Sequence, residues 1–230
     1  MNPPHDILTT TDVFLTLAGQ LKVSRYTNCG LDHIVLNLNE TATPLPSPSP
    51  GLRLKYLAIG RGIQNYTCPT APANSKDFVA EKPTAVGAVA TLYDASCAIG
   101  SDQKFLHTLP NFLARVMMES IDLAATFAGL TNPTARGAVL GVHYFTNTSS
   151  PFFDFRLGGG TEWINAKKVA SVPAPTSNVD VPWLKLDYDV GLGIQEVYRV
   201  HTSNGGAPAD CDGLHGPFQI GYAAEYWFYG

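Results

Sequence analysis

The sequence predicts an all-β protein, an antiparallel β-sandwich or barrel with one or two short helices. Apolar and polar residues alternate along most of its segments, which are bounded by Gly, Pro, Asn or Asp. Charged residues form only 15% of the 230 residues, whereas 21 glycines and 17 prolines supply many turns. Many short strands joined by turns are typical of sandwiches and barrels.

The alternating segments are the expected strands. In residues 52–59, LRLKYLAI, one face carries Leu52, Leu54, Tyr56 and Ala58, and Arg53 and Lys55 lie on the other. Further strands are expected at residues 86–96, 138–145, 153–158, 183–190, 196–202 and 221–230. The exception is residues 109–130, where apolar residues recur near helical spacing and Pro110 suits a first turn. We expect one helix there, packed against the sheet.

A proline-rich segment divides the chain. Residues 44–50, PLPSPSP, cannot form a helix or a central strand, because alternating prolines lack donors and hold the backbone extended. We therefore expect residues 1–50 to form an N-terminal arm and linker packed on the body, and residues 51–230 to form a single β domain. Within the arm, a short helix is expected from about Thr11 and a strand at residues 32–39.

Cysteines and glycosylation motifs indicate a secreted protein. The four cysteines are widely spaced, which favours two disulfides and leaves three pairings open: Cys29, Cys68, Cys97 and Cys211. Three asparagines head an Asn-x-Ser/Thr motif: Asn39, Asn65 and Asn147. The first residues lack an apolar signal region, so we expect Met1 to replace a signal peptide that is removed.

Several function classes are disfavoured. The net charge is −4 and Lys and Arg do not cluster, so no nucleic acid is expected as a partner. No segment approaches the roughly 20 apolar residues that span a bilayer. No metal or cofactor is expected, because the cysteines and histidines lack zinc-ligand spacing. No Gly-x-Ser-x-Gly motif is present, and Asp187 with Asp189 is more typical of a strand end than of a glycosidase site.

The Gly-x-Gly at residues 60–62 raises the question of a nucleotide-binding loop. Such a loop needs a third glycine and a following helix, whereas this sequence has Asn65 and then YTCPTAP. The two glycines are instead expected to allow a bulge or a close backbone approach within a strand, which displays Gln64 and Tyr66 on one face.

The segments GRGIQNYTC, AVGAVATLYDASC, KKVASVPAP, WLKL, EVYRVHT and AAEYWFYG, in this order, resemble a family of secreted fungal proteins of unknown function. Its members are often labelled malate dehydrogenase, which the Gly-x-Gly segment contradicts. The resemblance runs from about Gly51 to Gly230. Biosynthetic members of such families resemble hetero-Diels-Alderases that join a tropolone ortho-quinone methide to a humulene-type sesquiterpene olefin. The resemblance therefore implies a cofactor-independent pericyclase acting on small molecules.

Such an enzyme needs an aromatic-walled site with a few hydrogen-bond donors. The candidate catalytic residues are Arg61, Gln64 and His143, and the candidate substrate-binding residues are Tyr66, Tyr144, Trp163, Tyr226 and Trp227. Glu225 is expected to pair with an arginine, His107 to serve in a cap or loop, and His201 and His215 to be exposed. The alternative is a secreted, non-catalytic protein whose aromatic residues bind carbohydrate or cell-wall polymer.

Overall fold

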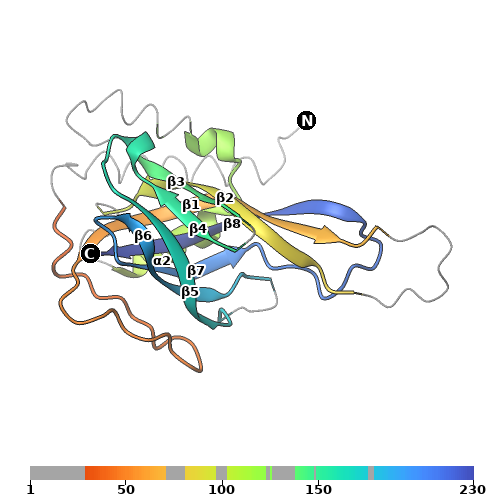
Figure 1. Cartoon of the computed structure of the whole chain (residues 1–230), viewed down its shortest axis with the longest axis horizontal. Coiled ribbons are helices and arrows are strands. Elements are labelled where there is room, and N and C mark those ends of the chain that lie inside the picture. The colour runs from red at the N-terminus through yellow and green to blue at the C-terminus, as the bar shows by residue number, and fades with distance from the viewer. Residues whose placement is uncertain are drawn as a thin grey trace, which may run out of the picture.

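A computed structural model describes residues 29–70, 81–96, 103–122, 125, 138–147, 149–175 and 179–230. The chain forms a closed barrel of eight antiparallel strands, in which each strand pairs with the next and β8 pairs with β1 (Figure 1). The all-β prediction is therefore confirmed, as a barrel rather than a sandwich.

The strands follow one another in an up-and-down order. They are β1 Leu54–Cys68, β2 Thr84–Asp94, β3 Val139–Phe145, β4 Pro151–Asp154, β5 Trp163–Val172, β6 Trp183–Leu192, β7 Glu196–Asn204 and β8 Gly216–Tyr229. Residues 153–158, expected as one strand, instead divide between the end of β4 and a 3₁₀ turn, Arg156–Gly158. Strand β5 has no counterpart among the strands expected from the sequence.

The barrel has two apolar cores, one on each side of its wall. Strand β8 contributes to both, because successive side chains point to opposite faces. Tyr222, Ala224, Tyr226 and Phe228 belong to the inner core, whereas Ala223, Trp227 and Tyr229 belong to the outer one.

Gly60 of β1, the first glycine of the Gly-x-Gly, has a packing role inside the barrel. A Cβ atom there would lie 2.8 Å from Cδ2 of Tyr226, so glycine makes room for this ring inside the barrel. The two glycines lie within a strand that pairs on both sides, as expected.

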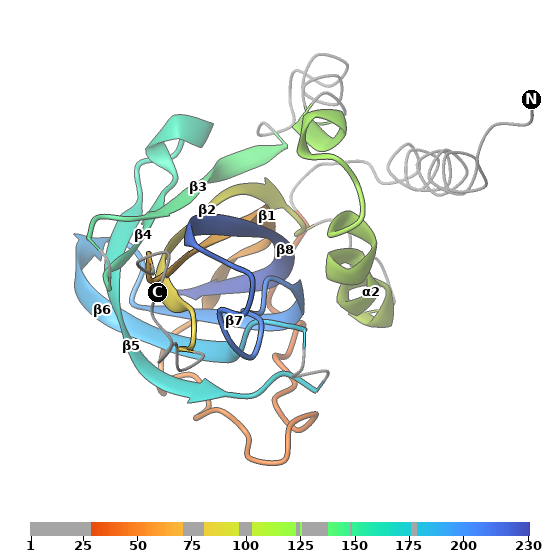
Figure 2. The ribbon, with the colours of Figure 1, turned by 90° about the vertical axis from the view of Figure 1, so that its right-hand side faces the viewer.

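The helix differs from its prediction. Helix α2 spans Gln103–Leu113 and packs on the outer face of the barrel, beside β7, β8 and β1 (Figure 2). It begins before the expected segment and contains Pro110 in its interior. Helical structure then stops and resumes at residues 118–122, so residues 109–130 are not one continuous helix.

Arg61 of β1 explains where α2 ends. Its guanidinium donates to the carbonyls of Leu113, Ala114 and Val116 at 2.9, 3.2 and 3.4 Å. A cation at the C-terminus of a helix satisfies carbonyls that lack helical partners and favours the helix dipole. The chain therefore leaves the helix at this point instead of continuing it.

The described part of the N-terminal segment, residues 29–50, lies on the outer wall. Residues 32–39 form no strand, yet Ile34, Leu36 and Leu38 are all buried in the outer core, so the alternation reports packing against the wall. The proline-rich residues 44–50 are held by β6 and β7: Lys185 donates to the Ser47 carbonyl at 3.0 Å, and Ser49 bonds the Glu196 carboxylate. The helix expected from about Thr11 lies outside the described residues.

One disulfide joins Cys68, at the end of β1, to Cys211. Cys29 is also disulfide-bonded, whereas Cys97 lies outside the described residues. Disulfides are compatible with the expected secretion. Within the described ranges, no helix is long and apolar enough to cross a membrane.

Candidate functional site

A group of polar side chains lies inside the barrel among its aromatic rings. We call it the interior polar cluster; its members are Gln64 of β1, His143 of β3, Arg199 of β7, and Tyr222 and Tyr226 of β8. All five are buried. Arg199 pairs in register with Tyr226, and the His143 ring lies 5.9 Å from the Tyr226 ring. Phe153 packs against the rings of His143 and Tyr226, and Phe228 stacks on Tyr226.

Arg199 gives the cluster its charge. Its side chain donates to the Pro182 carbonyl at 2.9 Å and, within the described part of the chain, forms no ion pair with a carboxylate. A buried cation usually has an anionic partner, because removing its charge from water is costly. The interior of the barrel is therefore suited to a ligand that brings negative charge or a strongly polarised oxygen.

Tyr222 and Tyr226 form a hydrogen-bonded pair, with 2.8 Å between their hydroxyl oxygens. Burial raises the pKa of both phenols above the ordinary value. Both hydroxyls are therefore protonated at neutral pH and can donate hydrogen bonds. The nearby Arg199 acts in the opposite direction, which would favour a phenolate, but burial dominates.

His143 is held as a neutral imidazole. Its Nδ1 lies 2.9 Å from the carbonyl oxygen of Phe152, and a carbonyl only accepts, so Nδ1 carries the proton. Burial lowers the pKa of His143 to about 4, with Arg199 contributing in the same direction. The ring stacks on Phe153, with 4.3 Å between centroids. Its Nε2 is consequently the basic nitrogen, and it can accept a hydrogen bond or a proton.

Gln64 and Tyr66 lie at one edge of the cluster, next to Gly205. The Nε2 of Gln64 is buried and has no hydrogen-bond partner among the described residues. A buried amide without a partner costs free energy, so it favours a ligand or a water that accepts its hydrogen bond. Tyr66 donates to the Gly205 carbonyl at 2.6 Å. Gly205 has a φ of 83°, and a Cβ atom there would lie 2.7 Å from Cβ of Tyr222 and 3.1 Å from Cγ of Gln64, so the position requires glycine.

The structure therefore brings together only part of the predicted site. Gln64, Tyr66, His143 and Tyr226 face the interior. Arg61 does not join them, since its guanidinium binds the end of α2 on the outer wall. Trp227 also faces outward and is fully buried in the outer core.

Tyr144 and Trp163 lie elsewhere on the outer wall. Their rings flank Phe152, at centroid distances of 5.1 and 5.5 Å, and Arg156 lies over the Trp163 ring. We call these three rings the outer aromatic ladder. Both tyrosine and tryptophan are half-buried.

Sequence reasoning missed Arg199 and Tyr222 as members of the site. Arg199 follows Val197 at an interval of two, and Tyr222 precedes Tyr226 by four, so period-2 alternation places each on the face of an inner residue. Knowledge of which face lies inside the barrel was the missing information. Outside this interior, the described residues that can hold a metal ion are Glu40, His107 and His201.

The three glycosylation motifs differ in exposure. Asn39 and Asn147 are exposed, whereas Asn65 is half-buried in β1, between β2 and β8. Attachment of a glycan requires an accessible side chain, so the first two positions suit the modification better.

Comparison with known proteins identifies one family. A family described as "Protein of unknown function (DUF3455)" matches residues 48–230, which include the whole barrel. No curated protein and no solved structure matches the chain.

Proposed function

We propose, starting from the chain's membership of this family of proteins of unknown function, that the barrel interior binds a small oxygen-bearing molecule and catalyses its cycloaddition. The observation that carries the proposal is the buried Arg199 guanidinium. It bonds the Tyr226 hydroxyl and has no carboxylate partner among the described residues. A polarised carbonyl or an enolate oxygen complements such a group of donors.

The proposed reaction is a stereoselective, intermolecular hetero-Diels-Alder cycloaddition, following the resemblance of the sequence. A hydroxymethyl tropolone loses water to give an ortho-quinone methide. The exocyclic carbon and the carbonyl oxygen of this heterodiene then each form one bond to a carbon of a humulene-type olefin. Two π bonds are lost and two σ bonds form, while the remaining π bond shifts to the centre of the former diene. No oxidant, reductant or cofactor is required.

Each member of the interior polar cluster has a role in this scheme. Arg199 and the Gln64 amide donate to the tropolone oxygens, where negative charge increases as the olefin attacks. His143 Nε2 accepts the tropolone hydroxyl proton during dehydration and returns it to the departing hydroxyl, which Tyr226 hydrogen-bonds and which leaves as water. Tyr66 lies at one edge of the interior polar cluster and limits the site on that side. The aromatic rings hold both reactants in one orientation, which supplies much of the acceleration of a cycloaddition.

The test is incubation with a hydroxymethyl tropolone and humulene, with analysis of product yield and enantiomeric ratio by chiral chromatography. A single enantiomer formed well above the rate without protein would support the proposal. Arg199→Met should reduce the rate by about 10²-fold, as removal of one oxyanion donor does in other enzymes. Trp163→Leu, on the outer wall, should leave it unchanged. A racemic product at the background rate would refute the proposal.

The outer aromatic ladder supports a second candidate function, carbohydrate binding. The half-buried rings of Tyr144 and Trp163 lie on either side of the buried Phe152 and, with the guanidinium of Arg156, are suited to stacking on sugar rings. The same two variants discriminate between the candidates: Trp163→Leu should abolish binding to cell-wall polysaccharide, and Arg199→Met should not. Secretion, with glycans on Asn39 and Asn147, suits either function.

A further inference from the structure

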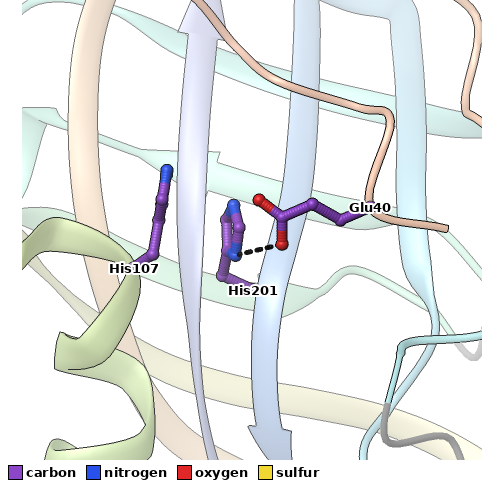
Figure 3. Close-up of side chains that lie close together, drawn as sticks. All are labelled: Glu40, His107 and His201. Atoms are coloured by element: carbon purple, nitrogen blue, oxygen red, sulfur yellow. Dashed lines mark ion pairs between the residues drawn. The ribbon is translucent and has the colours of Figure 1, made fainter. Parts of the chain in front are cut away.

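Three metal-binding side chains from distant parts of the sequence converge on the outer wall of the barrel. Glu40 comes from the N-terminal segment, His107 from α2 and His201 from β7 (Figure 3). One ligand atom of each residue lies within 4.8 Å of those of the other two. The sequence gives no indication of this group, because its members have no zinc-ligand spacing.

A hydrogen bond to the buried Glu225 holds His107 in a fixed orientation. Its Nδ1 lies 2.8 Å from Oε1 of Glu225, and the indole of Trp227 donates to the other carboxylate oxygen at 3.0 Å. Glu225 is fully buried. Its partners are His107 and Trp227, and not the arginine that the sequence led us to expect. Carboxylates that bind the second nitrogen of an imidazole in this way are the usual outer partners of metal-bound histidines. The nitrogen of His107 that can bind a metal is then Nε2.

His201 reaches the group because of a β-bulge. The pairing of β7 with β8 shifts in register between Val200 and Ser203, and His201 has a φ of 44°. Regular alternation would place His201 inside the barrel with Arg199, whereas the bulge turns it toward α2. Bulges commonly redirect a side chain next to a functional site.

The buried His201 ring has an unsatisfied nitrogen. Its side chain is only 7% exposed, and Nε2 has no hydrogen-bond partner within the described part of the chain. Its other nitrogen, Nδ1, lies 3.8 Å from Oε2 of Glu40. A buried polar atom without a partner costs free energy, and a metal ion would satisfy it. This is an independent indication of a ligand, beyond the proximity of the three residues.

We propose that Glu40, His107 and His201 bind a divalent transition-metal ion of the zinc class, with Glu225 as the positioning residue of His107. Two imidazoles and one carboxylate suit Zn²⁺, and three protein ligands leave a fourth position for water. The His107 and His201 rings stack at 3.8 Å with 18° between their planes, so one ring turns when both nitrogens meet one ion. Glu225 holds His107, and therefore His201 is the ring that turns. Glu40 is 41% exposed and can move toward the ion.

The test is calorimetric titration of the chelator-treated, tag-free protein with Zn²⁺, together with the visible absorption spectrum of the Co²⁺ complex. We expect one ion per chain and the intense bands of a four-coordinate cobalt site. His107→Gln, His201→Gln and Glu40→Gln should each weaken Zn²⁺ binding at least tenfold. Glu225→Gln should weaken it by 10- to 100-fold, as loss of an outer carboxylate does in other zinc sites.

A matched control is His33→Gln. His33 is an exposed histidine in the same N-terminal segment and lies outside the group, so its loss should not change the affinity. Because Glu40 is exposed, Glu40→Gln should fold normally in chelator, which separates loss of a ligand from loss of structure. Absence of Zn²⁺ binding, or binding that the Glu40 and His107 variants retain in full, would overturn the proposal.

Discussion

Replacement of Arg61 by methionine should destabilise the protein without changing the chemistry of the barrel interior. The guanidinium donates to five carbonyls, two on the barrel and three at the end of α2. The bonds to the Gly62 and Tyr222 carbonyls, at 2.8 and 3.0 Å, are buried, and each charged hydrogen bond contributes about 1.5 kcal/mol or more. The cation at the helix C-terminus adds up to about 1 kcal/mol. We therefore expect a loss of about 4 kcal/mol.

Urea unfolding, followed by tryptophan fluorescence, measures this loss, because Trp227 lies in the outer core with α2. Hydrogen exchange should show that the added opening is concentrated in residues 103–122. Arg61→Lys is the matched control: it keeps the charge but offers fewer donors, so its loss should be intermediate. A loss below about 1 kcal/mol with unchanged exchange in α2 would refute this role of Arg61. Loss of cycloaddition in a folded Arg61→Met protein would restore Arg61 as a catalytic candidate.

Three further predictions concern other parts of the fold. Gly60→Val should cost roughly 1–3 kcal/mol in urea unfolding, because the new side chain would overlap the Tyr226 ring. Gly30→Val, at an exposed position with open space around the new side chain, should cost less; equal losses would contradict the packing argument. Glu196→Gln should lower the free energy of unfolding by about 3 kcal/mol, because it leaves the buried Lys185 without the carboxylate that lies 3.2 Å away. It should also increase proteolysis at residues 44–50, and unchanged cleavage would show that this ion pair does not hold the segment. The pKa of His143 is about 4 in the folded state and 6.5 for an ordinary histidine of the unfolded chain, so between these pH values the unfolded chain binds more protons. The free energy of unfolding should therefore fall by about 3 kcal/mol as the pH drops from 6.5 to 4. A His143→Gln protein with the same pH dependence would refute this assignment.

The sequence predicted the β class and most strands because period-2 alternation survives wherever the pairing is regular. Strand β5 escaped prediction because its register shifts twice, between Asn165 and Ala166 and between Lys168 and Ala170, so its apolar residues do not alternate evenly. The helix boundaries were wrong for a tertiary reason. The apolar spacing of residues 109–130 continues past Leu113, but Arg61, a residue distant in sequence, binds the carbonyls at which α2 ends.

The sequence predicted which residues of the candidate site share a face of a strand, but not which face lies inside the barrel. Gln64, Tyr66, His143 and Tyr226, which the sequence proposed as site residues, face the interior, yet alternation does not tell which face of a strand is enclosed. Trp227 was therefore assigned to the same site as Tyr226, although adjacent residues of a strand lie on opposite sides of the wall. His201 illustrates a further limit, since a single bulge in β7 reverses the face that alternation assigns to it.

The pairing of β1 with β8 has a consequence for how the protein folds. All but one of the barrel's pairings join consecutive strands, but the last one joins segments at opposite ends of the barrel sequence. During synthesis, β1 emerges well before β8, and until then one of its edges has no strand to pair with. Such non-local closure makes folding slow and leaves a strand edge open to other chains. The nascent protein should therefore depend on chaperones until β8 has emerged, and truncation within β8 should cause aggregation rather than a smaller stable barrel.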